Sequence, residues 1–191
     1  MLYHGRERQA TTFGMAKQTG PNISAFLNKH SVASETLMLT SGAVEVSRWS
    51  WRFPSWAGVP PKDTYGGKAV VDCEGSPVFV ELAMIHVLRE HGFDWAVWVD
   101  NYRRRFRDAM PPAVCELPTH ARVLYDRIAT INGGRRGCWD ILAWNKEGVL
   151  FVECKRRGKD RMTLNQRTWL ESALKAGLHL DRFAICAWEI E

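Results

Sequence analysis

The sequence lacks the features that mark several large classes of protein. No apolar run in its 191 residues approaches the length needed to cross a bilayer, and no signal-peptide pattern opens it. It contains no internal repeat and no low-complexity tract. Its five cysteines form no C-x-x-C pair and sit mostly in apolar segments, so we expect buried free thiols rather than disulfides or zinc ligands. These absences favour a cytoplasmic protein with no membrane association.

The residues that are present favour one folded domain with a local excess of positive charge. Hydrophobic residues make up 46% of the chain, enough for a core of ordinary size. The net charge is +5, and residues 135–167 account for all of it, with nine Lys/Arg against four Asp/Glu. Such an excess attracts an anionic polymer, although a solvated basic face is the simpler alternative.

The most informative stretch is residues 137–157, GCWDILAWNKEGVLFVECKRR. Two short apolar runs flank a turn-rich Asn-Lys-Glu-Gly segment, which predicts a β-hairpin. Because alternate side chains of a strand share a face, Glu153 and Lys155 lie together on an otherwise apolar face. Asp140 interrupts the neighbouring strand in the same way. Two carboxylates and an ammonium group on adjacent strands can meet at one point, where they suit a hard divalent cation. The alternative is a structural ion pair.

Basic residues surround this hairpin at strand ends and in loops. Arg135 and Arg136 belong to a Gly-Gly-Arg-Arg-Gly loop whose backbone amides and guanidinium groups can contact phosphate. Arg156, Arg157 and Lys159 follow the second strand directly. We therefore expect these five residues to contact phosphates and to be separate from the acidic residues inside the strands.

Helix signals frame the hairpin on both sides. Ser76 is a suitable N-cap, Pro77 suits the first turn, and Gly92 suits a C-terminal cap, which predicts a largely buried helix between them. Glu81 is the one acid on an apolar sector of this helix. It therefore requires a partner, and a metal ion or a catalytic lysine would serve. A buried salt bridge to one of the many arginines is the alternative.

Two more helices and two more strands complete the expected order of elements. Ala121, Leu124, Ile128 and Ile131 give residues 119–132 the apolar stripe of a helix. Thr163-x-x-Gln166 has the form of a capping box and opens a helix that ends at Gly177. Gln166 falls near the middle of the apolar face of that helix, so we expect it to point toward the sheet. The expected strands are residues 93–101 and 182–191.

The order of these elements predicts an α/β fold with a mixed central β-sheet flanked by helices. We assign residues 76–191 to this domain and residues 1–75 to an N-terminal extension, partly disordered or in short strands such as ETLML and KAVVD. Trp49, Trp51 and Trp56 lie among arginines in the extension and can stack on unpaired bases. More often, such tryptophans simply cover a core.

Asp140 followed by Glu153-Cys154-Lys155 resembles the PD-(D/E)XK nuclease superfamily. The run ECKRRGKDRMTLNQRTWLESALKAG is similar, more narrowly, to the VRR-NUC branch, in which a glutamine follows the E-x-K strand on the next helix. The likeness covers roughly residues 76–191 and implies a restriction-endonuclease-like core. One departure is Trp139, which stands where the family name expects proline.

The resemblance implies a Mg²⁺- or Mn²⁺-dependent nuclease. Asp140 and Glu153 would be metal ligands, with the carbonyl of Cys154 as a third oxygen and Glu81 binding the metal through water. Lys155 would orient the attacking water or stabilise negative charge, and Gln166 would position Lys155 or a phosphate. A plain capping role is the alternative for Gln166.

These observations predict a DNA endonuclease that hydrolyses phosphodiester bonds, with RNA also open as the substrate and a homodimer among the possible states. A nucleic-acid-binding module without catalysis on the same fold is the alternative, and Trp139 leaves room for it. An enzyme of small anionic substrates is a third option, which the spread of arginines beyond the pocket disfavours.

Overall fold

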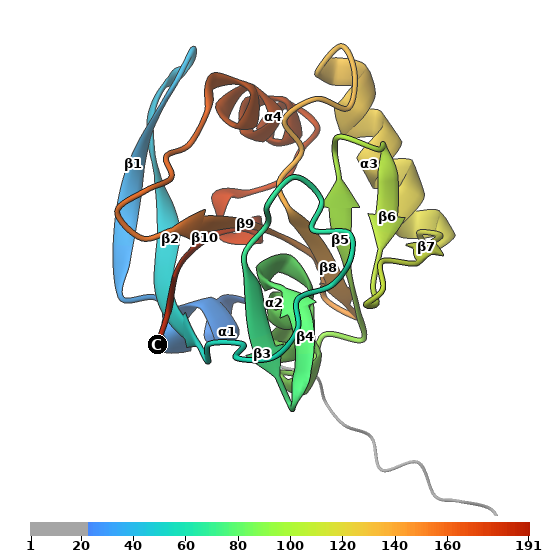
Figure 1. The fold of residues 1–191 in the computed structure, drawn as a ribbon. Helices are drawn as coiled ribbons and strands as arrows, with labels where there is room; N and C mark the ends of the chain where they lie inside the picture. Colours follow the sequence, from blue (N-terminus) through green and yellow to red (C-terminus); the bar gives the residue numbers. More distant parts are fainter. Residues whose placement is uncertain (1–22) are drawn as a thin grey trace, which may run out of the picture.

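The computed structural model describes residues 23–191 and is built on one mixed eight-stranded sheet (Figure 1). The strand order is β1-β2-β10-β9-β8-β5-β6-β7. Strand β10 runs parallel to both β2 and β9, and the other neighbours are antiparallel. The strands of the sheet are β1 (Ala33–Leu39), β2 (Gly42–Phe53), β5 (Trp95–Asp100), β6 (Arg105–Arg107), β7 (Val114–Cys115), β8 (Ile141–Asn145), β9 (Gly148–Arg156) and β10 (Phe183–Ile190).

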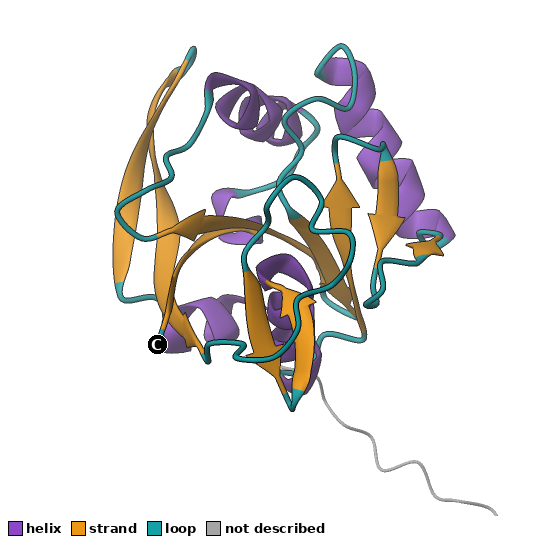
Figure 2. Cartoon of the chain, viewed as in Figure 1, coloured by secondary structure: helices purple, strands orange, loops and turns teal. Residues whose placement is uncertain are grey.

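Helices cover both faces of this sheet, which confirms the predicted α/β class (Figure 2). Helices α1 (Ile23–His30) and α2 (Val80–Glu90) pack on one face, together with a small hairpin of β3 (Val70–Cys73) and β4 (Ser76–Phe79). Helices α3 (Thr119–Ile131) and α4 (Leu164–Lys175) pack on the other. A 3₁₀ turn, η1 (Leu180–Arg182), precedes β10. Each face therefore has its own apolar core.

The predicted β8–β9 hairpin and the helix after it are confirmed. The turn places Gly148 at φ 130°, and the backbone amide of Glu147 donates to the side chain of Asn145. Thr163 and Gln166 form the complete capping box at the start of α4. Because α4 connects the parallel strands β9 and β10, it packs across the same face to which Glu153 points.

Residues 23–75 contribute to the same sheet and core as the rest of the described chain. The second half of strand β2 pairs with β10, from Ser47 opposite Ala184 to Phe53 opposite Ile190. The predicted boundary between residues 75 and 76 thus falls inside one continuous structure. Trp49 is 2% exposed and packs in the core beside Phe26, as the simpler alternative proposed. Residues 1–22 lie outside the described part.

The predicted start of the second helix is wrong. Glu74 and Gly75, both with positive φ, form a tight turn, and the carboxylate of Asp72 accepts from the amide of Gly75. Ser76 and Pro77 therefore begin strand β4, and α2 starts only at Val80. The local hairpin signal overrides the helix-capping signal because β4 pairs in full with β3.

Two expectations from the sequence concern the pairing of cysteines and the presence of membrane-spanning helices. All five cysteines are free thiols, and three of them, Cys138, Cys154 and Cys186, are buried. Among the described helices, none has both the length and the apolar character required to cross a bilayer.

Candidate active site

The candidate site forms where strands β8 and β9 part. Their pairing ends at Ile141 opposite Val152, so β9 continues through Glu153 and Lys155 without β8 beside it. Asp140 occupies this fork. Its carboxylate Oδ2 accepts from the amide of Cys154 at 3.0 Å, and its own amide donates to Oε2 of Glu153 at 3.2 Å. The two predicted acids therefore meet, as the hairpin geometry requires.

Gln166 connects the acid and the lysine of β9. Its Oε1 accepts from Nζ of Lys155 at 3.0 Å and from the amide of Thr163 at 2.9 Å, while its Nε2 donates to Glu153. Nζ of Lys155 also lies 2.9 Å from Oε1 of Glu153. The positioning and capping roles considered for Gln166 are thus both filled by one side chain. Because its amide is held at both ends, it fixes the orientation of Lys155 and Glu153.

Glu81 approaches the same fork from α2, on the opposite face of the sheet from α4. Its partner is a lysine, Lys68, which forms an ion pair with it. The side chains of Glu81 and Lys68 are 11% and 29% exposed. Sequence reasoning missed Lys68 because it sits in a Thr-Tyr-Gly-Gly-Lys turn outside any motif. A sequence signal existed only in Glu81 itself, as a buried acid that required a cation.

Burial and the nearby charge of Asp140 make Glu153 and Glu81 hard to ionise. Burial, and then the charge of Asp140, raise the pKa of Glu153 well above its usual range despite the nearby Lys155. Burial also raises the pKa of Glu81, with Lys68 opposing and Asp140 adding to the effect. For Lys68, burial lowers the pKa, but Glu81 and Asp140 outweigh it and the net direction is upward. The fork thus holds three carboxyl groups but only two lysines, and the raised pKa values favour the neutral forms of Glu153 and Glu81.

The carbonyl of Cys154 shares the open edge of β9 with Asp140. In a strand, the N–H and C=O of one residue point toward the same neighbour. Since the amide of Cys154 donates to Asp140, its carbonyl oxygen also faces the fork. Its thiol is buried in the core on the face covered by α2. The backbone oxygen, and not the sulfur, is therefore the atom available at the site.

The donor set at the fork fits a hard divalent cation. It offers carboxylate and carbonyl oxygens, which are the ligands that Mg²⁺ prefers in proteins. Within residues 23–191, the one group whose potential ligand atoms all lie within 4.8 Å of one another is elsewhere, at Glu74, His86 and Glu90. That group is exposed or half-buried on the outer surface of α2 and the β3–β4 turn.

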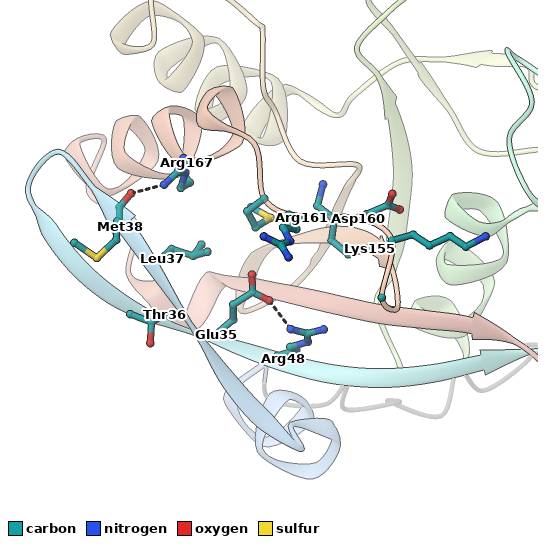
Figure 3. Close-up of a pocket in the computed structure, with 12 residues that line it drawn as sticks. Glu35, Thr36, Leu37, Met38, Arg48, Lys155, Asp160, Arg161 and Arg167 are labelled. Atoms are coloured by element: carbon teal, nitrogen blue, oxygen red, sulfur yellow. Dashed lines mark hydrogen bonds and ion pairs between the residues drawn. The ribbon is translucent and has the colours of Figure 1, made fainter.

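A basic groove of about 480 Å³ adjoins the fork (Figure 3). It separates the β1–β2 hairpin, carrying Glu35 and Arg48, from α4 and the loop before it, carrying Arg161 and Arg167. Nε of Arg167 is buried without a hydrogen-bond partner among the described residues. Its charged lining residues are the cations Arg48, Lys155, Lys159, Arg161 and Arg167 and the acids Glu35 and Asp160.

The structure separates the five predicted phosphate contacts. Lys159 lines the groove, whereas Arg136 lines a separate hollow of about 260 Å³ between the end of α3 and the start of α4. Arg135 pairs with Asp126 at 3.3 Å.

The two arginines that follow Lys155 have surface partners of their own. The guanidinium of Arg156 lies 5.4 Å from the ring centre of Trp188. Arg157 lies 3.4 Å from Glu189. Sequence reasoning did not select the groove arginines of β2 and α4, because they become neighbours only in the folded chain.

Comparison with known proteins leaves the chain without an assigned family, since no family model matches it and no curated protein is significantly similar.

Proposed function

We propose that the protein is a Mg²⁺- or Mn²⁺-dependent nuclease that hydrolyses phosphodiester bonds in DNA. The observation that carries the proposal is the meeting of Asp140 and Glu153 beside Lys155, with a basic groove adjoining them and Glu81 close enough to Asp140 to feel its charge. The resemblance of the Asp140 and Glu153-Cys154-Lys155 pattern to the PD-(D/E)XK superfamily supports the same chemistry. The free thiols suit a cytoplasmic location.

Asp140, Glu153 and the carbonyl of Cys154 would hold the cation, with Glu81 on the opposite side. The cation would lower the pKa of a bound water and neutralise charge on the phosphate. The raised pKa of Glu153 and Glu81 supports this assignment, because crowded carboxylates gain most from an added positive charge. The exposed Glu74–His86–Glu90 group lacks the neighbouring basic groove that a polyanionic substrate needs.

The remaining polar residues position the reacting groups. Lys155 presents its ammonium group at the boundary between the acids and the groove, where it stabilises negative charge on a phosphate. Gln166 holds that ammonium group in place through Oε1. The groove cations bind the phosphates of the DNA strand on the far side of the scissile bond. Such contacts do not depend on the base sequence.

A nucleic-acid-binding protein without catalysis is the second candidate. Both carboxylate oxygens of Glu153 already accept hydrogen bonds within the chain, from Gln166 and from the amide of Asp140, and Lys155 pairs with it. Trp139, in place of the family proline, is fully buried and donates to the carbonyl of Gln166. A structural role for the ion pair would leave binding by the groove intact.

The test is incubation of the purified protein with plasmid DNA and branched DNA in Mg²⁺, Mn²⁺ or EDTA. We expect nicking or cleavage with either metal and none in EDTA. Asp140→Asn should abolish cleavage without unfolding the protein. Cleavage that persists in EDTA or in Asp140→Asn would contradict the proposal, while tight binding without cleavage in any metal would favour the second candidate. Parallel reactions with RNA decide between the two nucleic acids.

A further inference from the structure

Another hollow, of about 440 Å³, lies beside Lys68. It lies between the loop around residues 63–68 and the loop at residues 100–103. Its size is within the range of sites that bind small molecules. Its lining residues are Asp63, Tyr65, Gly66, Lys68, Trp98, Asp100, Tyr102 and Arg103, which we call the aromatic pocket.

The walls of the aromatic pocket are held in place by contacts between the two loops. The carboxylate of Asp63 accepts from the amide of Tyr65 at 2.8 Å and from Arg103 at 3.1 Å. The guanidinium of Arg103 then lies 3.9 Å from the ring centre of Tyr65. Tyr65 and Gly66 both have positive φ, which bends the first loop around the hollow. The pocket is therefore a built feature and not a gap between mobile side chains.

The inner wall connects the pocket to the candidate active site. Nζ of Lys68 lies 4.9 Å from the ring centre of Trp98, inside the pocket, and the same ammonium group pairs with Glu81. Asp140 contributes to the electrostatic field on Lys68. A group seated in the pocket would thus lie next to the acids that are proposed to hold the metal.

The charge of the pocket favours a neutral, flat group over a phosphate. Two cations, Lys68 and Arg103, are balanced by two carboxylates, Asp63 and Asp100, whereas the basic groove has five cations against two. At the mouth, Tyr102 is 94% exposed and makes no hydrogen bond or ring contact with any described residue. The side chain of Arg103, which lies over the ring of Tyr65, is 40% exposed. Nucleobases stack on such aromatic rings and guanidinium planes.

We propose that the aromatic pocket binds the base of an unpaired nucleotide next to the scissile phosphate, with Tyr102 and Arg103 as its stacking surfaces. This inference rests on the proposed nuclease function and narrows its substrate class. A base within a duplex is stacked and paired, and reaching the pocket would require its extrusion. The substrate is therefore DNA with a single-stranded tail, flap or gap, its backbone in the basic groove and one base in the pocket.

Binding in EDTA tests the pocket without any cleavage. The probes are a duplex with a short single-stranded tail, the same duplex with abasic tail nucleotides, and a blunt duplex. The tail on either strand carries 2-aminopurine, whose fluorescence is quenched by stacking. The parent should quench the tail and bind it more tightly than the abasic or blunt probe. Tyr102→Ala should lose about tenfold in affinity for the tail alone, and Tyr102→Phe should retain it, because stacking needs the ring and not the hydroxyl.

Separate outcomes overturn the two proposals. If the parent and Tyr102→Ala bind all three probes equally, the aromatic pocket does not bind a base, whether or not the protein cleaves DNA. If the tail is preferred through Tyr102 but no metal supports cleavage, the pocket stands and the nuclease proposal falls. Arg161→Ala provides the matched control, since a phosphate contact in the groove should weaken binding of all three probes by a similar factor.

Discussion

The basic groove and the aromatic pocket flank one acidic fork, and they differ in almost every physical respect. The groove is bounded by long arginines on β2 and α4, has an excess of cations, and retains a buried Arg167 Nε without a partner among the described residues. The pocket is bounded by rings, is balanced in charge, and has its cations already paired with Asp63 and Glu81. Arg48 and Lys155 of the groove pair with Glu35 and Glu153, but Lys159 and Arg161 make no ion pair with any described residue. Cations without an ion pair suit a chain of phosphates, while paired cations beside rings suit a base. On the two proposals made above, local charge balance, more than total charge, decides which part of a substrate each surface binds.

The largest expected effect comes from the fork that the two hollows share. Glu153→Gln keeps the size of the side chain and removes its charge, so we expect cleavage to fall by about 10²–10³-fold or more while binding in EDTA stays unchanged. Single-turnover cleavage and a binding titration measure the two effects. Glu74→Gln is the matched control, because it belongs to the exposed acidic group on the outer surface and should leave cleavage intact. A loss of activity in Glu74→Gln with Glu153→Gln still active would move the site away from the fork.

The next largest effect is expected for Lys68, which lies between the fork and the aromatic pocket and should contribute to the stability of the protein. Lys68→Met keeps the apolar stem over Trp98 but leaves the buried Glu81 unpaired, which should cost about 2–3 kcal/mol of unfolding free energy. Mg²⁺ should then raise the melting temperature of this variant more than that of the parent, because the cation replaces the missing ammonium group. Lys62→Met in the same exposed loop is the control. Equal Mg²⁺ shifts in variant and parent would assign Glu81 to a salt bridge alone.

The groove arginines should change binding more modestly and in a salt-dependent way. Arg161→Ala with Arg167→Ala should flatten the plot of log affinity against log salt by about two units, one for each phosphate that an arginine no longer neutralises. Arg156→Ala with Arg157→Ala should flatten it less, because these arginines already contact Trp188 and Glu189. Salt titrations on a blunt duplex compare the two pairs. A larger effect from the second pair would place the DNA backbone at the strand ends and not in the groove.

The smallest effect concerns pH and lies far from both hollows. Burial, and then His91 and Lys29, lower the pKa of His30, which packs against Phe26 and Trp51. The unfolded chain therefore binds the proton more readily, and stability should fall slightly as pH drops below about 6.5. Thermal unfolding between pH 7 and 5 should show this decrease in the parent and less of it in His30→Gln. An equal decrease in both proteins would exclude His30 as the cause of the pH dependence of stability. If the decrease is smaller in His30→Gln, binding by the basic groove and by the aromatic pocket can be compared across pH in this variant.

Sequence reasoning succeeded where one short segment decides its own structure. The β8–β9 hairpin, the capping box at Thr163 and the helix over residues 119–131 each depend on neighbouring residues, and all three are confirmed. The meeting of Asp140, Glu153, Lys155 and Gln166 follows from the same segment, because strand alternation and one helix start place them together. Their chemical roles stay predictions.

The basic groove and the aromatic pocket could not be predicted from the sequence, because each is formed by segments that are distant in sequence. Arg48 faces Arg161 across the groove only because β2 pairs with β10, a long-range contact that no local pattern encodes. Lys68 reaches Glu81 because the β3–β4 hairpin displaces the expected helix start at Ser76. The three tryptophans near residue 50 drew attention as stacking residues, but Trp49 is in the core and Trp51 and Trp56 are half-buried. The most exposed ring of the aromatic pocket is that of Tyr102. The composition could indicate that aromatic residues are available for stacking on bases, but only the fold shows which of them are exposed beside the fork.

The central place of β10 has a consequence for the order in which the protein matures. This strand is synthesised after every other strand of the sheet, yet it lies between β2 and β9 and is hydrogen-bonded to both. Until it emerges from the ribosome, the β1–β2 hairpin has no neighbour to join it to the rest of the sheet, and one wall of the groove is missing. Such late, long-range pairing is slow and leaves strand edges open in the meantime. The nascent chain would therefore carry its acids and lysines before the groove is complete. On the proposed function, DNA could bind in the groove only once β10 has been synthesised.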